Sequence, residues 1–133
     1  MYTISPAWRA LQMAAVVLTF AFLECVDPVT PYVPVVTNAV DNFEYQVPVN
    51  GVTATTRYVW TNTGSSANVN LSSAVTAGTA ALTVSDADGA LVYTHALDGS
   101  GASNTGSGTS GNWMVVVTLG NAVGTVHFTL QKP

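Results

Sequence analysis

Charged residues are scarce in this chain of 133 residues, with three Lys or Arg and seven Asp or Glu, or 8% of the total. Nucleic-acid binding requires clustered Lys and Arg that neutralise phosphates, so the composition argues against that class of partner. It also argues against a polybasic contact with anionic lipids. Cys25 is the single cysteine, so no disulfide within one chain supports the fold, which must depend on its hydrophobic core.

Only one long apolar run is present, over residues 10–23, and it follows a short segment that carries Arg9. A basic start, a core of about 7–15 apolar residues and a processing point form the layout of a secretory signal. Cys25 follows the run at the place where a bacterial lipoprotein has its lipidated cysteine. We therefore predict a signal peptide over residues 1–24, with an N-terminal signal helix, and membrane attachment through a lipid on Cys25.

The residues before Cys25 leave two alternatives open. Lipoprotein signals usually have a small residue directly before the cysteine and an aliphatic residue three positions before it, whereas this chain has Glu24 and Phe22. Cleavage after Ala21 would release a secreted protein with a free thiol. The apolar run is shorter than the about 20 residues that span a bilayer, so an uncleaved anchor would need its flanking residues. Each interpretation exports the domain, and the expected location is the bacterial cell envelope, at the outer membrane or cell surface.

Residues 25–40 are predicted to form a tether. Pro28, Pro31 and Pro34 recur at every third position, and this spacing favours an extended polyproline II segment. The end of the segment is rich in valine for a solvated linker. We therefore expect this end to pack on the following domain or to form a first edge strand.

From Asp41 onward, apolar and polar residues alternate, and turn residues interrupt the alternation. Residues 48–51 and 120–122 are predicted turns, and one further edge strand is predicted around residues 102–105. No helical periodicity follows Leu23. The pattern predicts an all-β domain over residues 41–133, an antiparallel, jelly-roll-like β-sandwich of seven or eight short strands.

Several motifs occur in a characteristic order. They are YVW at 58–60, the hairpin LTVSDADGALVY at 82–93, GNWMVVV at 111–117 and GTVHFTL at 124–130. In this order they resemble the bacterial pre-peptidase C-terminal domain and related jelly-roll modules of secreted proteins. The resemblance covers roughly residues 43–131 and implies an accessory or binding module without catalytic residues. Such modules usually accompany an enzyme domain, and none is visible in this sequence.

Three aspartates are candidate calcium ligands. Asp86 and Asp88 precede Gly89 in the predicted hairpin turn, and Asp98 ends the same hairpin. A helix–loop–helix calcium site has a glutamate at the position of His95, so that kind of site is absent. A turn alone accounts for the Asp and Gly residues, because Asp bonds its own backbone and Gly accepts a positive φ. The favoured interpretation is a structural turn, with no metal and no cofactor.

The remaining candidates concern ligand binding. Tyr58, Trp60, Tyr93 and Trp113 would form a platform for sugars if their rings were exposed, but each shares a strand face with apolar residues, which favours the core. His95 and His127 lack the further ligands that zinc requires.

Residues 113–119 are apolar on both faces, because Met114 and Val116 occupy the second face. This pattern indicates a central strand, a strand covered by the tether, or contact with a protein partner. No nucleophile–base or acid–base pair is visible in the sequence. We therefore expect a non-enzymatic domain that binds a protein or glycan partner or has a structural role. The alternatives are a carbohydrate-binding module and an accessory domain of a secreted enzyme system.

Overall fold

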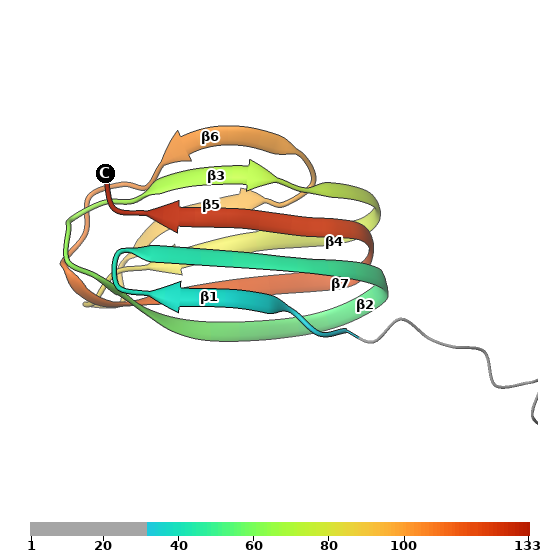
Figure 1. Ribbon diagram of the computed structural model, residues 1–133, viewed down its shortest axis with the longest axis horizontal. Coiled ribbons are helices and arrows are strands. Elements are labelled where there is room, and N and C mark those ends of the chain that lie inside the picture. Colours follow the sequence, from blue (N-terminus) through green and yellow to red (C-terminus); the bar gives the residue numbers. More distant parts are fainter. Residues whose placement is uncertain (1–31) are drawn as a thin grey trace, which may run out of the picture. The chain divides into compact units, whose positions relative to one another are not determined.

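The computed structural model describes residues 32–133, which form an all-β domain (Figure 1). All strand pairs are antiparallel, so the predicted fold class is confirmed. The seven strands are β1 (Val35–Ala39), β2 (Asn42–Asn62), β3 (Asn68–Ser72), β4 (Ala74–Ser85), β5 (Leu91–Ala96), β6 (Ser100–Asn104) and β7 (Gly111–Gln131). Within residues 32–133, no helix has the length and apolar character needed to cross a membrane. The predicted signal helix and Cys25 lie outside the described residues.

Strands β2 and β7 have 21 residues each and pair with one another along nearly their whole length. Both strands bend near their middle, and they therefore contribute to two layers. One layer has the order β1-β2-β7-β3-β6, and the other consists of the second half of β2, the first half of β7, β4 and β5. A single sheet thus folds on itself into a sandwich, as Figure 1 shows.

The bends of β2, β4 and β7 lie at one edge of the domain, on the right in Figure 1. The pairing register shifts near Gly51 in β2 and near Gly78 in β4, and both glycines have positive φ values, 71° and 73°. The predicted turns at residues 48–51 and 120–122 are therefore wrong, because the strands continue through both segments as bulged bends. The same residue types favour turns and bulges. Here the strands stay paired on both sides of each bend, and this pairing makes the segments bulges instead of turns.

The core lies between the two layers and is formed by the inward-facing residues of every long strand. Trp60 and Trp113 are both fully buried and meet edge to face, with ring centroids 5.9 Å apart. The Nε1 of Trp60 donates to the Ala39 carbonyl at 3.0 Å, and that of Trp113 donates to the Thr109 carbonyl at 2.8 Å. Each indole therefore buries a large apolar ring while its N–H group remains hydrogen-bonded.

The valine-rich end of the predicted tether forms β1, an edge strand beside β2. Just before it, the hydroxyl of Tyr32 lies 3.1 Å from that of the buried Tyr45. Burial raises the pKa of the Tyr45 phenol, and the hydrogen bond with Tyr32 adds to the effect. The chain is thus fixed to the domain from Tyr32 onward.

Candidate functional site: a groove between β5 and β6

The two lateral sides of the sandwich differ, and the candidate site lies on the more open one. On the side of β1 and the second half of β2, three hydrogen bonds join the layers. Asn38 Nδ2 donates to the Val59 carbonyl at 2.9 Å, Trp60 Nε1 donates to Ala39, and the Asp41 amide donates to the Thr61 carbonyl at 2.9 Å. These bonds close the first side.

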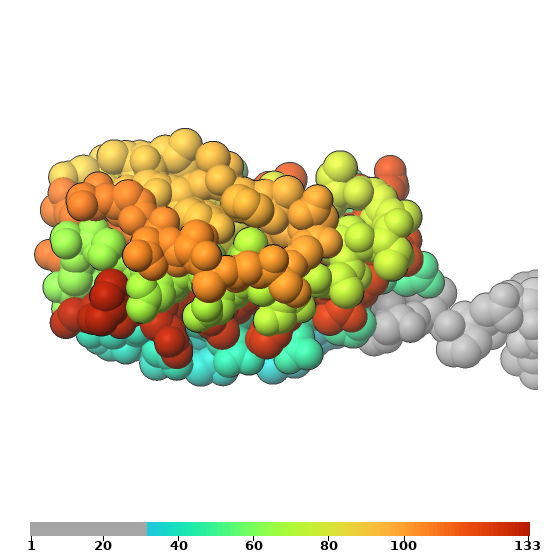
Figure 2. Space-filling model, turned by 90° about the horizontal axis from the view of Figure 1, so that it is seen from above, coloured from blue at the N-terminus to red at the C-terminus, as the bar shows by residue number. Residues whose placement is uncertain are grey.

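Strands β5 and β6 form the edges of the two layers on the opposite side, which Figure 2 shows from above with β6 in orange. Every residue of β6 is exposed, and among the strands of residues 32–133 it pairs only with β3. Two hydrogen bonds cross from β6 and its following loop to β5. The Gly106 amide donates to the Val92 carbonyl at 2.8 Å, and the hydroxyls of Tyr93 and Ser103 lie 3.2 Å apart.

The groove between these two strands contains a cavity of about 180 Å³. Leu71 lines it from β3, His95 from β5 and Asp98 from the corner between β5 and β6. Gly101 leaves room for the cavity, because it pairs with Leu71 and a Cβ added to it would meet no atom within 4 Å. The imidazole of His95 lies nearly parallel to the Tyr93 ring, with centroids 6.1 Å apart.

Two side chains that line the cavity, His95 and Asp98, can accept hydrogen bonds. The Nδ1 of His95 lies 2.7 Å from the Ala96 carbonyl, which can only accept, so Nδ1 carries the proton. In the neutral ring, Nε2 is therefore an acceptor. The carboxylate of Asp98 is exposed at the same cavity. The groove is thus suited to groups that donate hydrogen bonds.

Asp86, one of the calcium candidates, is fully engaged in the β4–β5 turn. Its carboxylate accepts from the amides of Asp88 at 3.0 Å, Ala90 at 2.8 Å and Thr109 at 2.9 Å. These backbone donors, Thr109 foremost, hold the pKa of Asp86 below its usual range. Asp88 accepts from the Thr109 hydroxyl at 2.7 Å. The carboxylates therefore join the turn to the loop before β7, as the structural interpretation expects.

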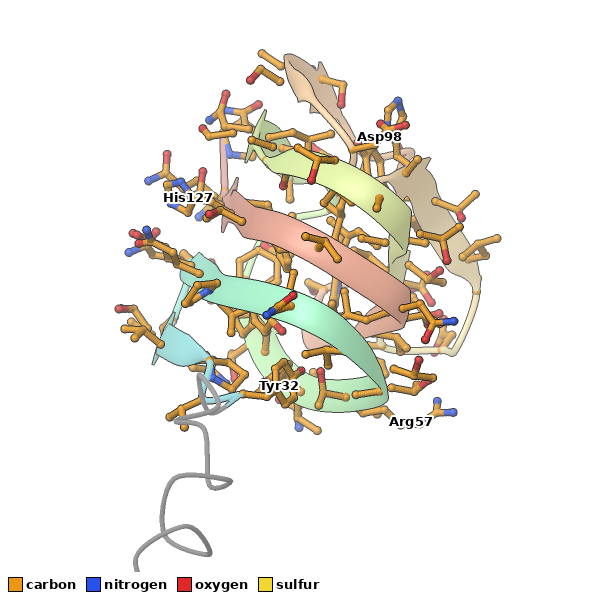
Figure 3. All side chains as sticks on the ribbon, turned by 90° about the vertical axis from the view of Figure 1, so that its right-hand side faces the viewer. Tyr32, Arg57, Asp98 and His127 are labelled. Carbon is orange, nitrogen blue, oxygen red and sulfur yellow. The ribbon has the colours of Figure 1, made fainter. Side chains whose placement is uncertain are left out.

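The structure does not bring Asp98 to the other two aspartates, because β5 separates the corner at Asp98 from the turn at Asp86. His127 lies on the other layer, with Nε2 3.2 Å from Glu44 Oε1. Figure 3 shows Asp98 and His127 well apart. Within the part of the chain that the structure describes, no three His, Cys, Asp or Glu side chains are placed to hold a metal ion.

The four aromatic candidates have different environments. Trp60 and Trp113 lie in the core, so that expectation is confirmed. Tyr58 is half-buried against Phe43. Only Tyr93 borders the groove. No residue pattern in the sequence points to this groove, because small residues such as Gly101 leave the space that forms it.

The central-strand interpretation of residues 113–119 is confirmed, since the first half of β7 pairs with β2 on one side and with β4 on the other. Met114 on its outer face lies in register between Val59 and Ser85, and Ser85 lies opposite Leu91. Val59 and Leu91 are more than half exposed.

No protein-family model matches the chain, and a search of curated proteins finds no significant match. The resemblance to the pre-peptidase C-terminal domain therefore stays a prediction.

Proposed function

We propose that this chain is an exported bacterial cell-envelope protein, held at a membrane through a lipid on Cys25, whose β-sandwich is a non-enzymatic binding domain. The groove between β5 and β6 is its binding site. The observation that carries the proposal is the difference between the two sides of the sandwich. Side chains close the β1–β2 side, whereas the β5–β6 side keeps a cavity beside an exposed edge strand.

A carbohydrate is the second candidate ligand for the same groove. The observation that favours it is the parallel arrangement of Tyr93 and His95 beside the hydroxyl of Ser103 and the carboxylate of Asp98. Sugar recognition combines a flat ring face with polar groups of this kind. The burial of Trp60 and Trp113 removes the larger platform that the sequence offered.

The membrane anchor is tested by replacing the cysteine. We expect the full wild-type chain, expressed in a bacterial host, to fractionate with membranes and to incorporate labelled palmitate. Cys25→Ser should lose both properties, whereas the control variant Thr19→Ser in the apolar run should keep them. Retention of Cys25→Ser in the membrane fraction, with an unlabelled wild type, would instead support an uncleaved anchor.

The binding site is tested by filling the cavity. Gly101→Leu places a side chain in open space on the inner face of β6, so the domain should remain folded. Asn70→Leu is the matched control, because Asn70 lies on the neighbouring strand β3, is exposed and does not line the cavity. Detergent-solubilised full chains are compared on a glycan array and in a peptide selection. Loss of binding in Gly101→Leu, with binding kept in Asn70→Leu, is the expected result, and equal binding by both variants would contradict the site.

A further inference from the structure

We infer that the groove binds an extended segment of a partner protein, which adds a strand to the free edge of β6 and places a Lys or Arg side chain in the cavity. This inference rests on the proposed binding function and names the class of partner. It is carried by the backbone of β6, by the direction in which an added strand would present its side chains, and by the charge of the groove.

The hydrogen-bond pattern shows which backbone groups of β6 are free. The Thr105 amide donates to the Ala67 carbonyl, and the Ser73 amide donates to the Gly99 carbonyl. Antiparallel bonds fall on alternate residue pairs, so residues 101 and 103 also bond to β3. The N–H and C=O groups of Ser100, Ala102 and Asn104 therefore point away from β3, along the free edge.

Apart from its short length of five residues, this edge has, within residues 32–133, none of the features that usually protect an edge strand. Proteins block such edges with lysines, prolines, bulges or covering segments. Strand β6 reads SGASN, has no charge and no proline, and pairs with β3 without a register shift. On the opposite side of the domain, the Asn38 side chain and the Trp60 indole cover the equivalent edges. Strand β6 is thus a template for an added strand, a known mode of peptide recognition.

An added strand would direct alternate side chains toward the cavity. Ser103 and Gly101 of β6 lie on the inner face, in register with the buried Val69 and Leu71. Side chains of a neighbouring strand alternate in the same way, so every second one would face β5. Backbone bonds would supply affinity, and the cavity at His95 would supply specificity.

The charge of the groove selects the side chain that enters. Asp98 and His95 line the cavity, and Nε2 of His95 accepts a hydrogen bond when the ring is neutral. The two cations of residues 32–133 lie elsewhere. Arg57 projects from the outer face of β2 (Figure 3), and Lys132 Nζ donates to the Thr63 hydroxyl at 3.1 Å. A Lys or Arg of the partner would satisfy these acceptors, whereas a Glu would be repelled by Asp98.

A selection from a phage-displayed library of random linear peptides tests the inference. The full chain, solubilised in detergent and immobilised through a C-terminal tag, is the target. We expect enriched sequences that alternate β-branched and other residues and share one Lys or Arg at a fixed position. Absence of enriched peptides, or enrichment of acidic residues at that position, would overturn the inference.

Two variants test the backbone edge of β6 and the charge of the cavity separately. Ala102→Pro removes an amide hydrogen that points away from β3, so it should weaken the selected peptides at least about tenfold. The control Asn70→Val changes the exposed residue of β3 that pairs with Ala102, leaves the free edge unchanged and should bind like the wild type. Asp98→Asn should reduce the preference for Lys over Glu at the fixed position by about tenfold. Full binding by Ala102→Pro, or an unchanged preference in Asp98→Asn, would contradict the proposed geometry.

Other occupants give different results. Binding of a glycan that Gly101→Leu abolishes and Ala102→Pro leaves intact would overturn the peptide inference while supporting the proposed function. Self-association lost in Ala102→Pro, without peptide enrichment, would make a second copy the occupant. Membrane retention is measured separately with Cys25→Ser, so peptide binding by a chain that is not membrane-held would overturn only the anchor.

Discussion

The β1–β2 side and the β5–β6 side of the sandwich are both places where two sheet edges approach each other, and they differ in how the edges are treated. On the first side, Asn38 and Trp60 bridge the layers through carbonyl oxygens. On the second, β6 consists of small residues and leaves a cavity over Leu71. The closed side supports the fold, whereas the open side keeps backbone groups and space available to a ligand.

Under the proposed function, this contrast would let one domain combine stability with binding. A chain without disulfides needs a core that is tightly packed, and the buried indoles contribute to it, with Trp60 bonded to β1 on the closed side. The open side needs little packing, because the bonds at Gly106 and Ser103 already hold β6 near β5. Substitutions on the two sides should therefore differ in their cost to stability.

The largest expected difference concerns aromatic truncations. Trp60→Ala should lower the free energy of unfolding by about 3–5 kcal/mol, because it opens a cavity and removes the donor to Ala39. Tyr93→Ala on the open side should cost about 1–2 kcal/mol, because that ring is only partly buried. Urea denaturation of both variants measures the difference. Equal losses would show that the open side is packed as tightly as the closed one.

The glycines give the next largest contrast. Gly124 has a φ of 131°, and an added Cβ would collide with the Ala74 carbonyl, so Gly124→Ala should cost at least about 2 kcal/mol. Gly101→Ala should change stability by no more than about 0.5 kcal/mol, because its Cβ would lie in open space. Thermal melts of the two variants are compared with the wild type. A melt of Gly101→Ala that falls as far as that of Gly124→Ala would contradict the open cavity.

A smaller effect is expected from pH. Backbone amides lower the pKa of Asp86, and the amide of Thr63 lowers the pKa of Asp41. A lowered folded-state pKa adds stability above the unfolded value of about 3.9, and this contribution is lost as the pH falls through the folded-state value. Urea midpoints should therefore be constant from pH 7 to about 5 and decrease below about 4.

Asp86→Asn should be less stable than the wild type at neutral pH and lose less of its remaining stability on acidification. Asp98→Asn on the open side is the matched control and should stay within about 0.5 kcal/mol of the wild type at neutral pH. An acid-induced loss in Asp86→Asn as large as that of the wild type would show that the Asp86 turn is not involved.

The smallest expected effects come from single hydrogen bonds that link the layers. Asn38→Ala removes the bond to Val59 on the closed side and should cost about 0.5–1 kcal/mol. Ser103→Ala removes the exposed bond to Tyr93 and should cost about 0.5 kcal/mol or less. Chemical denaturation resolves the two if both are measured against the same wild-type series. A larger loss in Ser103→Ala would reverse the assignment of the closed and open sides.

Much of the fold follows from alternation along the strands. The inward positions of residues 54–60 and 113–119 and the edge strand near Ala102 are predictable from the period-two pattern. The bends at Gly51 and Gly78 are not, because a glycine in a bulge and a glycine in a turn look the same in one sequence. Only the paired strands show that the chain continues through these positions.

The candidate site is less predictable than the fold, for a related reason. The aromatic and aspartate candidates are conspicuous residue types, and Trp60, Trp113 and Asp86 are used by the fold itself. The groove depends on the absence of a side chain at Gly101 and on the direction of backbone groups in β6. Neither feature has a characteristic residue pattern, so three-dimensional pairing is needed to find it.

Amide hydrogen exchange of the full chain, followed residue by residue by NMR in detergent, tests the open edge of β6 most directly. We predict alternation along the strand, with slow exchange at Gly101 and Ser103, which face β3, and fast exchange at Ala102. The Asp41 amide, which donates to Thr61 on the closed side, should also exchange slowly. An Ala102 amide as protected as that of Ser103 would show that the edge is already occupied and would contradict the account.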